Sequence, residues 1–470
     1  MSSALEGIYE PGIVDPGVPS TSGTKPFWHS SPHPFANHQS EWPKDVVDIV
    51  VIGSGITGMN LVRTLLKHSS NLNIVLVEAR SLCSGATGRN GGHCKTMTFA
   101  MWEERKRSFG IDEAVRISAF EHKHLEAMAS AIREDRIDCD LVLTDGVEAY
   151  YDQKDFEKAV AALEDMRVHA PQLANLHTVH TDKAYLSQVL KLSRRAVGAI
   201  TIPAASLWPY KWITTALGRL VDQGKLNVQT DTPVREVIDH SKDSYATVRT
   251  ARGDIRAKNV VHATNAWLGH LLPELRPFIS PVRGNVVAYA PVRNNGKGAS
   301  PLGLDSRNSL WLRYGAKDYD YLIQREDGGV IVGRANTGRK ATGDDSETDL
   351  SAMAHLRGFA DEAVASPLPG SSSHISHAWA GILAFSQDGL PFAGRLNLAG
   401  RAHQWVCGGY HATGMIKAFL TSQMVAGMIL GESCPGDFPQ SIFLTEDRIR
   451  QLRKSVESGK PVVHNTKARL

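Results

Sequence analysis

Apolar residues near the start of the chain form β-branched runs separated by a stretch of helical spacing. The run VVDIVVIG at 46–53 is typical of a buried strand, and it ends in glycine. Apolar residues then recur every three or four positions from Ile56 to Leu66, which predicts a helix. The run NIVLVEA at 73–79 predicts a second buried strand. This order of strand, helix and strand predicts a βαβ unit, and therefore a parallel sheet.

Further along the chain, long helical patterns alternate with many short apolar runs. Residues 112–134 and 413–431 predict two long helices, and Gly431 followed by Pro435 is typical of a helix end. Strands are predicted at 140–144, 196–203, 227–238, 245–265, 285–292, 321–334 and 404–410. We therefore expect an α/β protein in which a second, α+β domain built on an antiparallel sheet interrupts the parallel one.

The two ends of the chain lack this periodicity. Residues 1–44 contain seven prolines, which predicts an extended arm. The aromatic cluster Phe27, Trp28 and His29 either docks on the body of the protein or belongs to a solvated tail. Residues 433–470 are expected to form a C-terminal tail.

Composition narrows the class of protein. The 470 residues are 42% hydrophobic and 21% charged, as in globular proteins. A net charge of +3 argues against a nucleic acid or a membrane surface as the partner. The five cysteines lack C-x-x-C spacing, so we expect neither a disulfide framework nor a metal site. Without a long apolar run or a signal peptide, the protein is expected to be soluble and not secreted.

The first of two glycine clusters lies where the first predicted strand meets its helix. The sequence GSGITG at 53–58 has G-x-G-x-x-G spacing, whose glycines permit a tight turn and close approach of a pyrophosphate. Glu78 follows 20 positions beyond Gly58, where a carboxylate accepts ribose hydroxyls. A turn with only a structural role would not require that acid. The predicted dinucleotide contacts are Gly53, Gly55, Ile56, Thr57, Gly58, Glu78, Ala79 and Arg80.

The second glycine cluster indicates which dinucleotide binds. The segment SLCSGATGRNGGHCK at 81–95 offers many backbone amides, for which an NAD enzyme has no need. EAR at 78–80 followed by GATGRNGG at 85–92 resembles the flavin-binding segment of the D-amino-acid oxidase superfamily. That superfamily includes glycine oxidase, sarcosine oxidase and γ-glutamylputrescine oxidase, and the G-R-N-G-G form is most similar to the last.

The resemblance extends from residue 46 to residue 432. Four further segments are similar to family motifs: TPVREV at 232–237, VVHATNAW at 260–267, HAWAGILAFSQDGLPFAG at 377–394 and CGGYHATGM at 407–415. The resemblance implies a Rossmann-like FAD-binding domain of the GR2 type, assembled from 45–110, 195–272 and 375–432. It implies a substrate domain formed by 111–194 and 273–374.

The resemblance also implies which residues contact FAD. The second glycine cluster would pass beneath the flavin, and the start of the helix at 413 would place positive potential near flavin N1 and O2. Arg89 either contacts a phosphate or the flavin edge, or forms a surface ion pair. The further FAD contacts expected are Thr87, Gly88, Arg89, Asn90, Gly91, Gly92, Val234, Ala263, Thr264, Gly381, Gly409, Thr413, Gly414 and Met415.

The chemistry implied by the family is the oxidation of an amine. A carbon-bound hydrogen leaves as hydride to flavin N5, water hydrolyses the imine, and dioxygen becomes hydrogen peroxide. His93, Tyr410, His411 and Trp379 are the candidate catalytic residues, although each histidine could equally serve packing.

Two departures from the sarcosine-oxidase branch are visible. The cysteine that tethers flavin there falls at Gly381, and the oxygen-activating lysine falls at Ile331. FAD is therefore expected to bind non-covalently, with Cys407 in a packing role, and rapid use of oxygen requires another cation.

The substrate pocket is expected over the flavin, between the two domains. Aromatic side chains would exclude water and face a cation, and the candidates are Trp208, Tyr210, Trp311, Tyr314, Trp379 and Tyr410. Arg283 and Arg313 could each bind a substrate carboxylate, or lie at the surface.

The last three residues resemble a peroxisomal address. Ala468, Arg469 and Leu470 present a small residue, a base and a terminal leucine. An enzyme that releases peroxide would suit that compartment, with the peroxisomal import receptor as a partner. The alternative is a disordered basic tail in a cytoplasmic protein.

Three functions remain open at this stage. The first is an FAD-dependent oxidase of a small amine or amino acid. The second is an FAD-dependent dehydrogenase of a 2-hydroxy acid or polyol with an acceptor other than oxygen. The third is a flavin-binding protein without turnover that serves trafficking or assembly.

Overall fold

The computed structural model describes residues 15–96, 99–239, 244–294, 297–304, 308–315, 318–335, 341–367, 370, 374–460 and 462. Its core is built on two large sheets. The first sheet contains β1 (Val47–Ile52), β2 (Ile74–Val77), β7 (Asn227–Gln229), β8 (Val234–Asp239), β9 (Ala246–Thr250), β10 (Gly253–His262), β18 (Phe392–Arg395) and β19 (Gln404–Gly408).

The first sheet is mainly parallel, as predicted. Its strand order is β18-β19-β10-β1-β2-β7, and β1 pairs in parallel with both β10 and β2. Every residue of β2 is buried, which explains the continuous apolar run of that segment. Helix α1 (Ile56–His68) packs against α9 (Ala418–Ile429), and the buried Asn60 side chain donates a 2.7 Å hydrogen bond to the Phe419 carbonyl.

The second sheet is mixed and mostly antiparallel. Its order is β17-β11-β16-β15-β14-β4-β6-β3, with β5 beside β6. The strands are β3 (His93–Cys94), β4 (Val142–Tyr150), β5 (Thr178–His180), β6 (Gly198–Ser206), β11 (Ile279–Tyr289), β14 (Ser309–Gly315), β15 (Asp318–Gln324), β16 (Val330–Ala335) and β17 (Ile375–Ser386). A parallel nucleotide sheet with an antiparallel second sheet confirms the predicted fold class.

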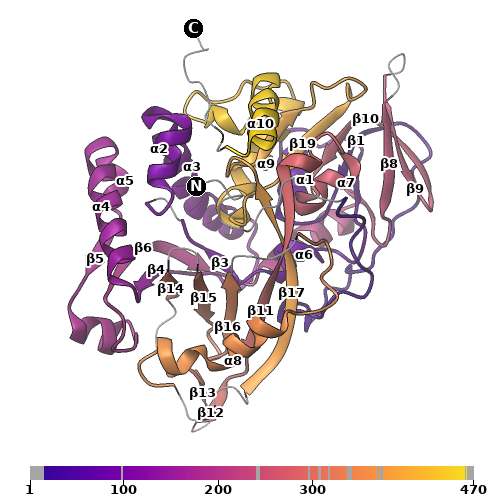
Figure 1. The fold of residues 1–470 in the computed structure, drawn as a ribbon. Coiled ribbons are helices and arrows are strands. Elements are labelled where there is room, and N and C mark those ends of the chain that lie inside the picture. The colour runs from indigo at the N-terminus through magenta and orange to yellow at the C-terminus, as the bar shows by residue number, and fades with distance from the viewer. Residues whose placement is uncertain are drawn as a thin grey trace.

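Helices cover both faces of the second sheet (Figure 1). Helix α8 (Leu350–Ala363) lies below it, while α2 (Trp102–Phe109) and α3 (Ile111–Glu134) lie above it, on the side of α9. The other helices are α4 (Gln153–His169), α5 (Pro171–Ala174), α6 (Pro209–Asp222), α7 (Leu268–Leu271) and α10 (Glu446–Ser458). A separate hairpin joins β12 (Val292–Asn294) and β13 (Lys297–Ala299). No helix in the described part of the chain is both long and apolar enough to span a bilayer.

Strand membership does not follow the predicted residue ranges throughout. β3, β6 and β17 belong to the second sheet, although their residues fall within the ranges predicted for the nucleotide domain. β17 pairs with β11 along its whole length, from Ile279 opposite Ser386 to Tyr289 opposite Ile375. The two predicted domains are therefore interleaved at these strands, and their boundaries stay a prediction.

Two local predictions need correction, and one open alternative is settled. The helix expected at 413–431 begins at Ala418, because 414–416 form a separate 3₁₀ turn, η7 (Gly414–Ile416). The described part of the arm is docked, since Trp28 is 1% exposed and its indole donates to the Asn90 carbonyl. The expected C-terminal tail contains α10, which is anchored by the buried pair of Arg448 with Asp388.

Candidate active site

One cavity of about 840 Å³ runs between the two sheets. Its walls come from the turn after β1, the end of β2, the segment 85–91, strands β11 and β17, and the loop 410–417. These segments are far apart in sequence, yet they are the ones that carry the sequence motifs. A space of this volume with a few polar groups in its lining is typical of a cofactor and substrate site.

Glycine is sterically required in the turn after β1. A Cβ atom at Gly58 would lie 1.9 Å from the Gly53 carbonyl oxygen, a backbone atom that has no room to move. Gly53 has a φ of +110°, a conformation that other residues rarely adopt. Gly58 therefore lets the first turn of α1 pack on the strand, while Gly53, Gly55, Ile56 and Thr57 line the cavity.

Glu78 reaches back to the same turn. Its Oε2 accepts bonds from the Ser54 amide at 3.0 Å and the Ser54 hydroxyl at 2.6 Å, and its Oε1 accepts one from the Arg80 amide. A carboxylate offers about four acceptor positions, so capacity remains for a ribose hydroxyl. Ala79, Val234, Ala263 and Thr264 line the cavity nearby, and the buried Thr264 hydroxyl has no partner among the described residues.

The second glycine cluster packs between the sheets. Thr87 Oγ1 accepts a bond from the Ile56 amide at 3.1 Å, which joins this segment to the start of α1. Gly91 lies so close to Tyr321 that an added Cβ would be 2.6 Å from its ring. Thr87, Arg89, Asn90 and Gly91 line the cavity, whereas Gly88 and Gly92 lie behind it, against Cys83 and Ile323.

Arg89 is part of a buried ion pair. Its side chain is 5% exposed, and its Nε lies 3.2 Å from an Asp345 oxygen that also pairs with Arg80. Arg89 also donates to the Ser84 and Ala380 carbonyls. Burial lowers its pKa to about 10, and Arg80 acts in the same direction. The alternative of a surface ion pair is therefore wrong, and contact with FAD stays a prediction.

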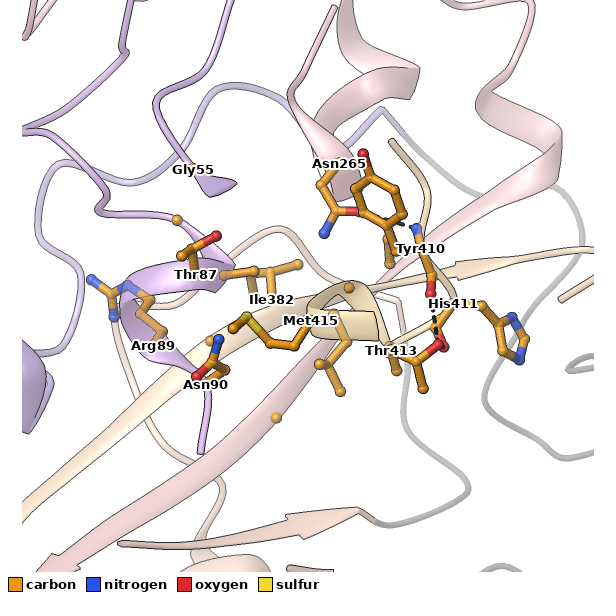
Figure 2. A pocket seen from close by; sticks show the side chains of 18 of the residues that line it. Gly55, Thr87, Arg89, Asn90, Asn265, Ile382, Tyr410, His411, Thr413 and Met415 are labelled. Atoms are coloured by element: carbon orange, nitrogen blue, oxygen red, sulfur yellow. Dashed lines mark hydrogen bonds between the residues drawn. The ribbon is translucent and has the colours of Figure 1, made fainter. Parts of the chain in front are cut away.

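The loop at 409–413, before η7, faces the second glycine cluster across the cavity (Figure 2). Gly409, His411 and Ala412 all have positive φ angles. The Asn265 side-chain oxygen holds the loop by accepting from the amides of Gly409 at 3.1 Å and Tyr410 at 3.2 Å. Asn265, which itself has a φ of +46°, was not among the predicted site residues, although it follows Thr264 in the VVHATN motif.

The remaining residues of this wall differ in how they face the cavity. Tyr410, His411, Thr413, Gly414 and Met415 line it, whereas Gly409 packs behind, against Phe392. The Tyr410 hydroxyl is 2.9 Å from Thr57 Oγ1 and joins the loop to α1.

Gly381 on β17 lines the cavity. A Cβ atom added to Gly381 would lie 3.0 Å from the Cβ of Arg89. Trp379 is fully buried outside the described lining, and its indole donates to the Arg89 carbonyl. Trp379 thus supports the flavin segment rather than forming a wall of the cavity.

Both candidate histidines are held neutral. Burial, assisted by Lys95, lowers the pKa of His93 to about 3. Burial and Lys417 do the same to His411, whose pKa is also about 3. Nδ1 of His93 lies 2.6 Å from Ser309 Oγ, and Nδ1 of His411 lies 3.1 Å from the Ser386 carbonyl. Neither side chain is therefore a cation at neutral pH.

Two buried charge clusters on the cavity wall were not predicted as groups. In the first, Glu148 on β4 pairs with Lys95 at 2.9 Å and with Arg313 at 3.0 Å. In the second, Glu121 on α3 pairs with Arg105 at 2.6 Å and lies 3.6 Å from Lys417. Each cluster joins two bases to one acid. Sequence offers only weak signals for them, because Lys95 and Lys417 adjoin the motifs whereas their partners are distant.

The predicted substrate-pocket residues are only partly brought together. Trp311, Arg283, Arg313 and Tyr410 line the cavity. Trp208, Tyr210 and Tyr314 lie elsewhere; Trp208, for example, packs against Phe27 of the arm. Tyr319 and Tyr321 of β15 line the cavity and supply the aromatic walls that were expected from Trp208, Tyr210 and Tyr314.

The two sheets and the cavity between them are typical of an FAD-binding oxidoreductase. Comparison with known proteins gives its family. The profile of the family described as FAD dependent oxidoreductase (DAO) matches residues 48–428. The chain belongs to this family, and its cofactor is FAD.

Individual relatives are distant. The chain is 23% identical to gamma-glutamylputrescine oxidoreductase of Escherichia coli K12, over 88% of this chain and 90% of that protein. Its fold is similar to glycine oxidase from Geobacillus kaustophilus, with a TM-score of 0.67, 20% identity and coverage of 85% of this chain and 98% of that one. It is also similar to FAD-bound L-alpha-glycerophosphate oxidase from Mycoplasma pneumoniae, with a TM-score of 0.61, 13% identity and coverage of 85% and 99%.

The described residues fit FAD. The glycine turn leaves room for a pyrophosphate, Glu78 retains acceptor capacity, and Thr264 presents an unpaired buried hydroxyl to the same cavity. These groups would hold the adenosine and pyrophosphate. The flavin end would lie against the loop 410–413 and η7 rather than against the first turn of α9, which begins only at Ala418, so the positive potential expected there from the start of that helix stays a prediction.

Proposed function

We propose that this protein is an FAD-dependent oxidase of a small amine that also carries a carboxylate, such as an amino acid. The observation that carries the proposal is a group of unpaired side-chain nitrogen atoms in residues that line the FAD cavity. Arg313 Nη2, Trp311 Nε1 and His93 Nε2 are buried and have no hydrogen-bond partner among the described residues. The names of the relatives, glycine oxidase and gamma-glutamylputrescine oxidoreductase, support an amine as the reacting group.

These donors belong to a net positive pocket. Glu148 is already engaged by three donors, because Oε1 accepts from Lys95 and Oε2 accepts from both Arg313 and the Tyr150 hydroxyl. Two bases and one acid leave one positive charge uncompensated, beside donors that lack an acceptor. Buried donors without partners cost about 1–3 kcal/mol each, so an anionic ligand is favoured here. A carboxylate supplies two acceptor oxygens and the missing negative charge.

The aromatic walls complete the pocket. The Lys95 ammonium lies 3.9 Å from the centre of the Trp311 ring, and the Arg313 guanidinium lies 5.0 Å from the Tyr319 ring. These rings exclude water and hold both cations in place. The neutral His93, with its Nδ1 against Ser309, adds a donor without adding charge if Nε2 carries the proton.

In the proposed reaction, the substrate loses a hydrogen from carbon and one from nitrogen to form an imine. Water then hydrolyses the imine to a carbonyl compound and a free amine or ammonia. FAD, when bound, supplies the two-electron oxidation. Dioxygen takes the two electrons and two protons and becomes hydrogen peroxide. Lys95 and Lys417 are two of the lysines that line the cavity and could assist oxygen in place of the residue at Ile331, which is buried in β16.

A 2-hydroxy acid is the second candidate, because the same donors would bind its carboxylate. The decisive experiment is anaerobic bleaching of the bound flavin by matched amino and hydroxy acids, followed by a peroxide assay in air. We expect bleaching and peroxide with amino acids only. Bleaching by hydroxy acids alone would establish the second candidate, and no bleaching by any compound would favour a flavoprotein without turnover.

The position of the carboxylate is tested with Arg313→Met. We expect it to raise KM for a carboxylate-bearing amine by about tenfold or more, since it removes a charge-assisted hydrogen bond. Oxidation of the matching amine that lacks the carboxylate is the control and should change little. Equal losses for both amines would contradict the assignment.

We further propose that FAD is bound non-covalently and that the protein is imported into peroxisomes. None of the described cavity-lining residues is a cysteine, and Cys407 is fully buried. All flavin should therefore appear in the supernatant after acid precipitation.

Ala468, Arg469 and Leu470 lie outside the described residues, so targeting is tested in cells with an N-terminal fluorescent fusion. Deleting Leu470 should disperse a punctate signal.

A further inference from the structure

The described part of the N-terminal arm lies beside the FAD cavity, although the family match begins only at residue 48. The arm adds an edge to the first sheet, where the Ser40 amide donates to the Val228 carbonyl. It then crosses the second glycine cluster, where Trp28 bonds to the carbonyl of Asn90 at 2.6 Å. The arm therefore contacts segments that line the cofactor cavity.

Thr24 locks the arm to these segments. Its hydroxyl accepts from Arg89 Nη1 at 3.1 Å and from the Ala380 amide at 2.9 Å, and its own amide donates to the Asp345 carbonyl. A side chain at the preceding residue would displace this ion pair, because a Cβ at Gly23 would lie 2.8 Å from Arg89 Nη2 and 2.9 Å from Arg80 Nη1. The arm thus meets the ion pair that supports the flavin segment.

The outermost described residues of the arm reach the cavity itself. Gly17, Val18 and Pro19 line it and are partly exposed, so they lie between the cavity and solvent. Just before them, Asp15 accepts from His270 Nδ1 at 2.8 Å and from Arg276 at 2.7 Å. His270 also lines the cavity, so this ion pair ties the arm to the cavity wall.

We propose that residues 15–24 are part of the FAD-binding site and hold the cofactor in place without a covalent bond. Release of FAD past residues 15–24 would require Asp15 and Thr24 to lose their partners. The arm thereby retains FAD in a protein whose described cavity lining contains no cysteine to which the flavin could be attached. Reciprocally, bound FAD should hold the arm closed, because each stabilises the other by the same free energy.

The test measures release of FAD from the purified holoenzyme by the rise in flavin fluorescence after dilution. Thr24→Val should speed release by about tenfold, since it removes a bond to a charged group. Asp15→Asn should speed it by about threefold, because its pairs are partly exposed. Glu41→Gln is the matched control, since Glu41 lies in the same arm and its carboxylate pairs with the exposed Lys44. This control should release FAD at the unaltered rate.

A second readout separates retention from general destabilisation. If the arm retains FAD, Thr24→Val lowers the melting temperature of the holoenzyme more than that of the apoprotein. Hydrogen exchange in a peptide covering residues 15–24 should also accelerate when FAD is removed. Unaltered release rates in both variants would overturn the proposal. Equal loss of stability in holo and apo forms, with exchange independent of FAD, would also overturn it by assigning the arm a structural role only.

Discussion

The charge of a single lysine sets how this site should respond to pH. Lys95 is fully buried, and burial lowers its pKa to about 8 although the hydrogen bond to Glu148 favours the charged form. The pKa of Glu148 is lowered to about 2, because Arg313 and Lys95 outweigh the effect of burial, and that of His93 is about 3. Between pH 5 and pH 9, Lys95 is therefore the member of this group expected to titrate.

We predict that an inert carboxylate such as acetate binds the holoenzyme with constant affinity from pH 5.5 to about 7, and more weakly above pH 8. Loss of the Lys95 proton removes a positive charge from the site, so affinity should fall by up to about tenfold per pH unit. The measurement is titration of the visible flavin spectrum with acetate at each pH.

Variants identify which lysine is responsible. The pKa of Lys417 is also lowered to about 8 by burial, so both lysines would titrate together. Lys95→Met should give a weak, pH-independent affinity, whereas Lys417→Met should keep the slope. A slope that survives in Lys95→Met would show that the carboxylate does not meet this residue.

At the scale of elements, the turn between β1 and α1 is the part of the site that sequence specified best. The spacing of Gly53, Gly55 and Gly58 reflects contacts that only glycine permits, so local sequence determines it. The start of α9 was placed wrongly, because apolar periodicity continues through η7 while three residues with positive φ precede it. Such backbone angles at His411 and Ala412 depend on tertiary contacts, such as the hydrogen bond from the Ala412 amide to the Ala384 carbonyl.

The two buried charge clusters mark the limit of sequence reasoning at this scale. Glu148 and Arg313 meet because β4 pairs with β14 in parallel, with Trp311 opposite Glu148. Nothing local to either strand states that pairing. Burial of Glu121 beside Lys417 likewise depends on α3 packing against η7. The glycine motifs are local in sequence and could therefore be predicted. The two buried charge clusters form only when distant strands and helices pack together.

The glycine turn gives a prediction for these elements. Gly58→Ala would place its Cβ 1.9 Å from the Gly53 carbonyl oxygen, so the start of α1 must move away from β1. We expect the dissociation constant for FAD to rise at least about tenfold, since the turn no longer fits the pyrophosphate. The measurement is fluorescence quenching of FAD titrated with apoprotein.

A second helical glycine provides the control. Gly358 lies in α8, where an added Cβ would meet nothing within 4 Å. Gly358→Ala should leave FAD affinity unchanged and stabilise the protein by up to about 1 kcal/mol, as alanine favours helix. Unaltered FAD affinity in Gly58→Ala would indicate that the pyrophosphate does not lie against this turn.

Across the whole molecule, one buried carboxylate joins parts that are distant in sequence. Asp345 is fully buried and pairs with Arg80 and Arg89, which lie after β2 and in the second glycine cluster. Its backbone carbonyl accepts from Thr24 of the arm. Arg89 in turn bonds to the Ala380 carbonyl on β17 of the second sheet. The ion pair therefore links the arm, the flavin segment and both sheets.

Asp345→Asn should therefore destabilise the molecule as a whole. The amide has nearly the same shape, but it leaves two guanidinium groups buried together without a countercharge. Breaking a buried pair in this way costs about 3–5 kcal/mol, which we expect as the loss in free energy of unfolding measured in urea. Asp437→Asn is the control, because Asp437 pairs with Lys123 at an exposed site and should change stability by less than about 1 kcal/mol. A loss as small as that of the control would mean that the two arginines find other acceptors, and that the arm and the flavin segment are held together without Asp345.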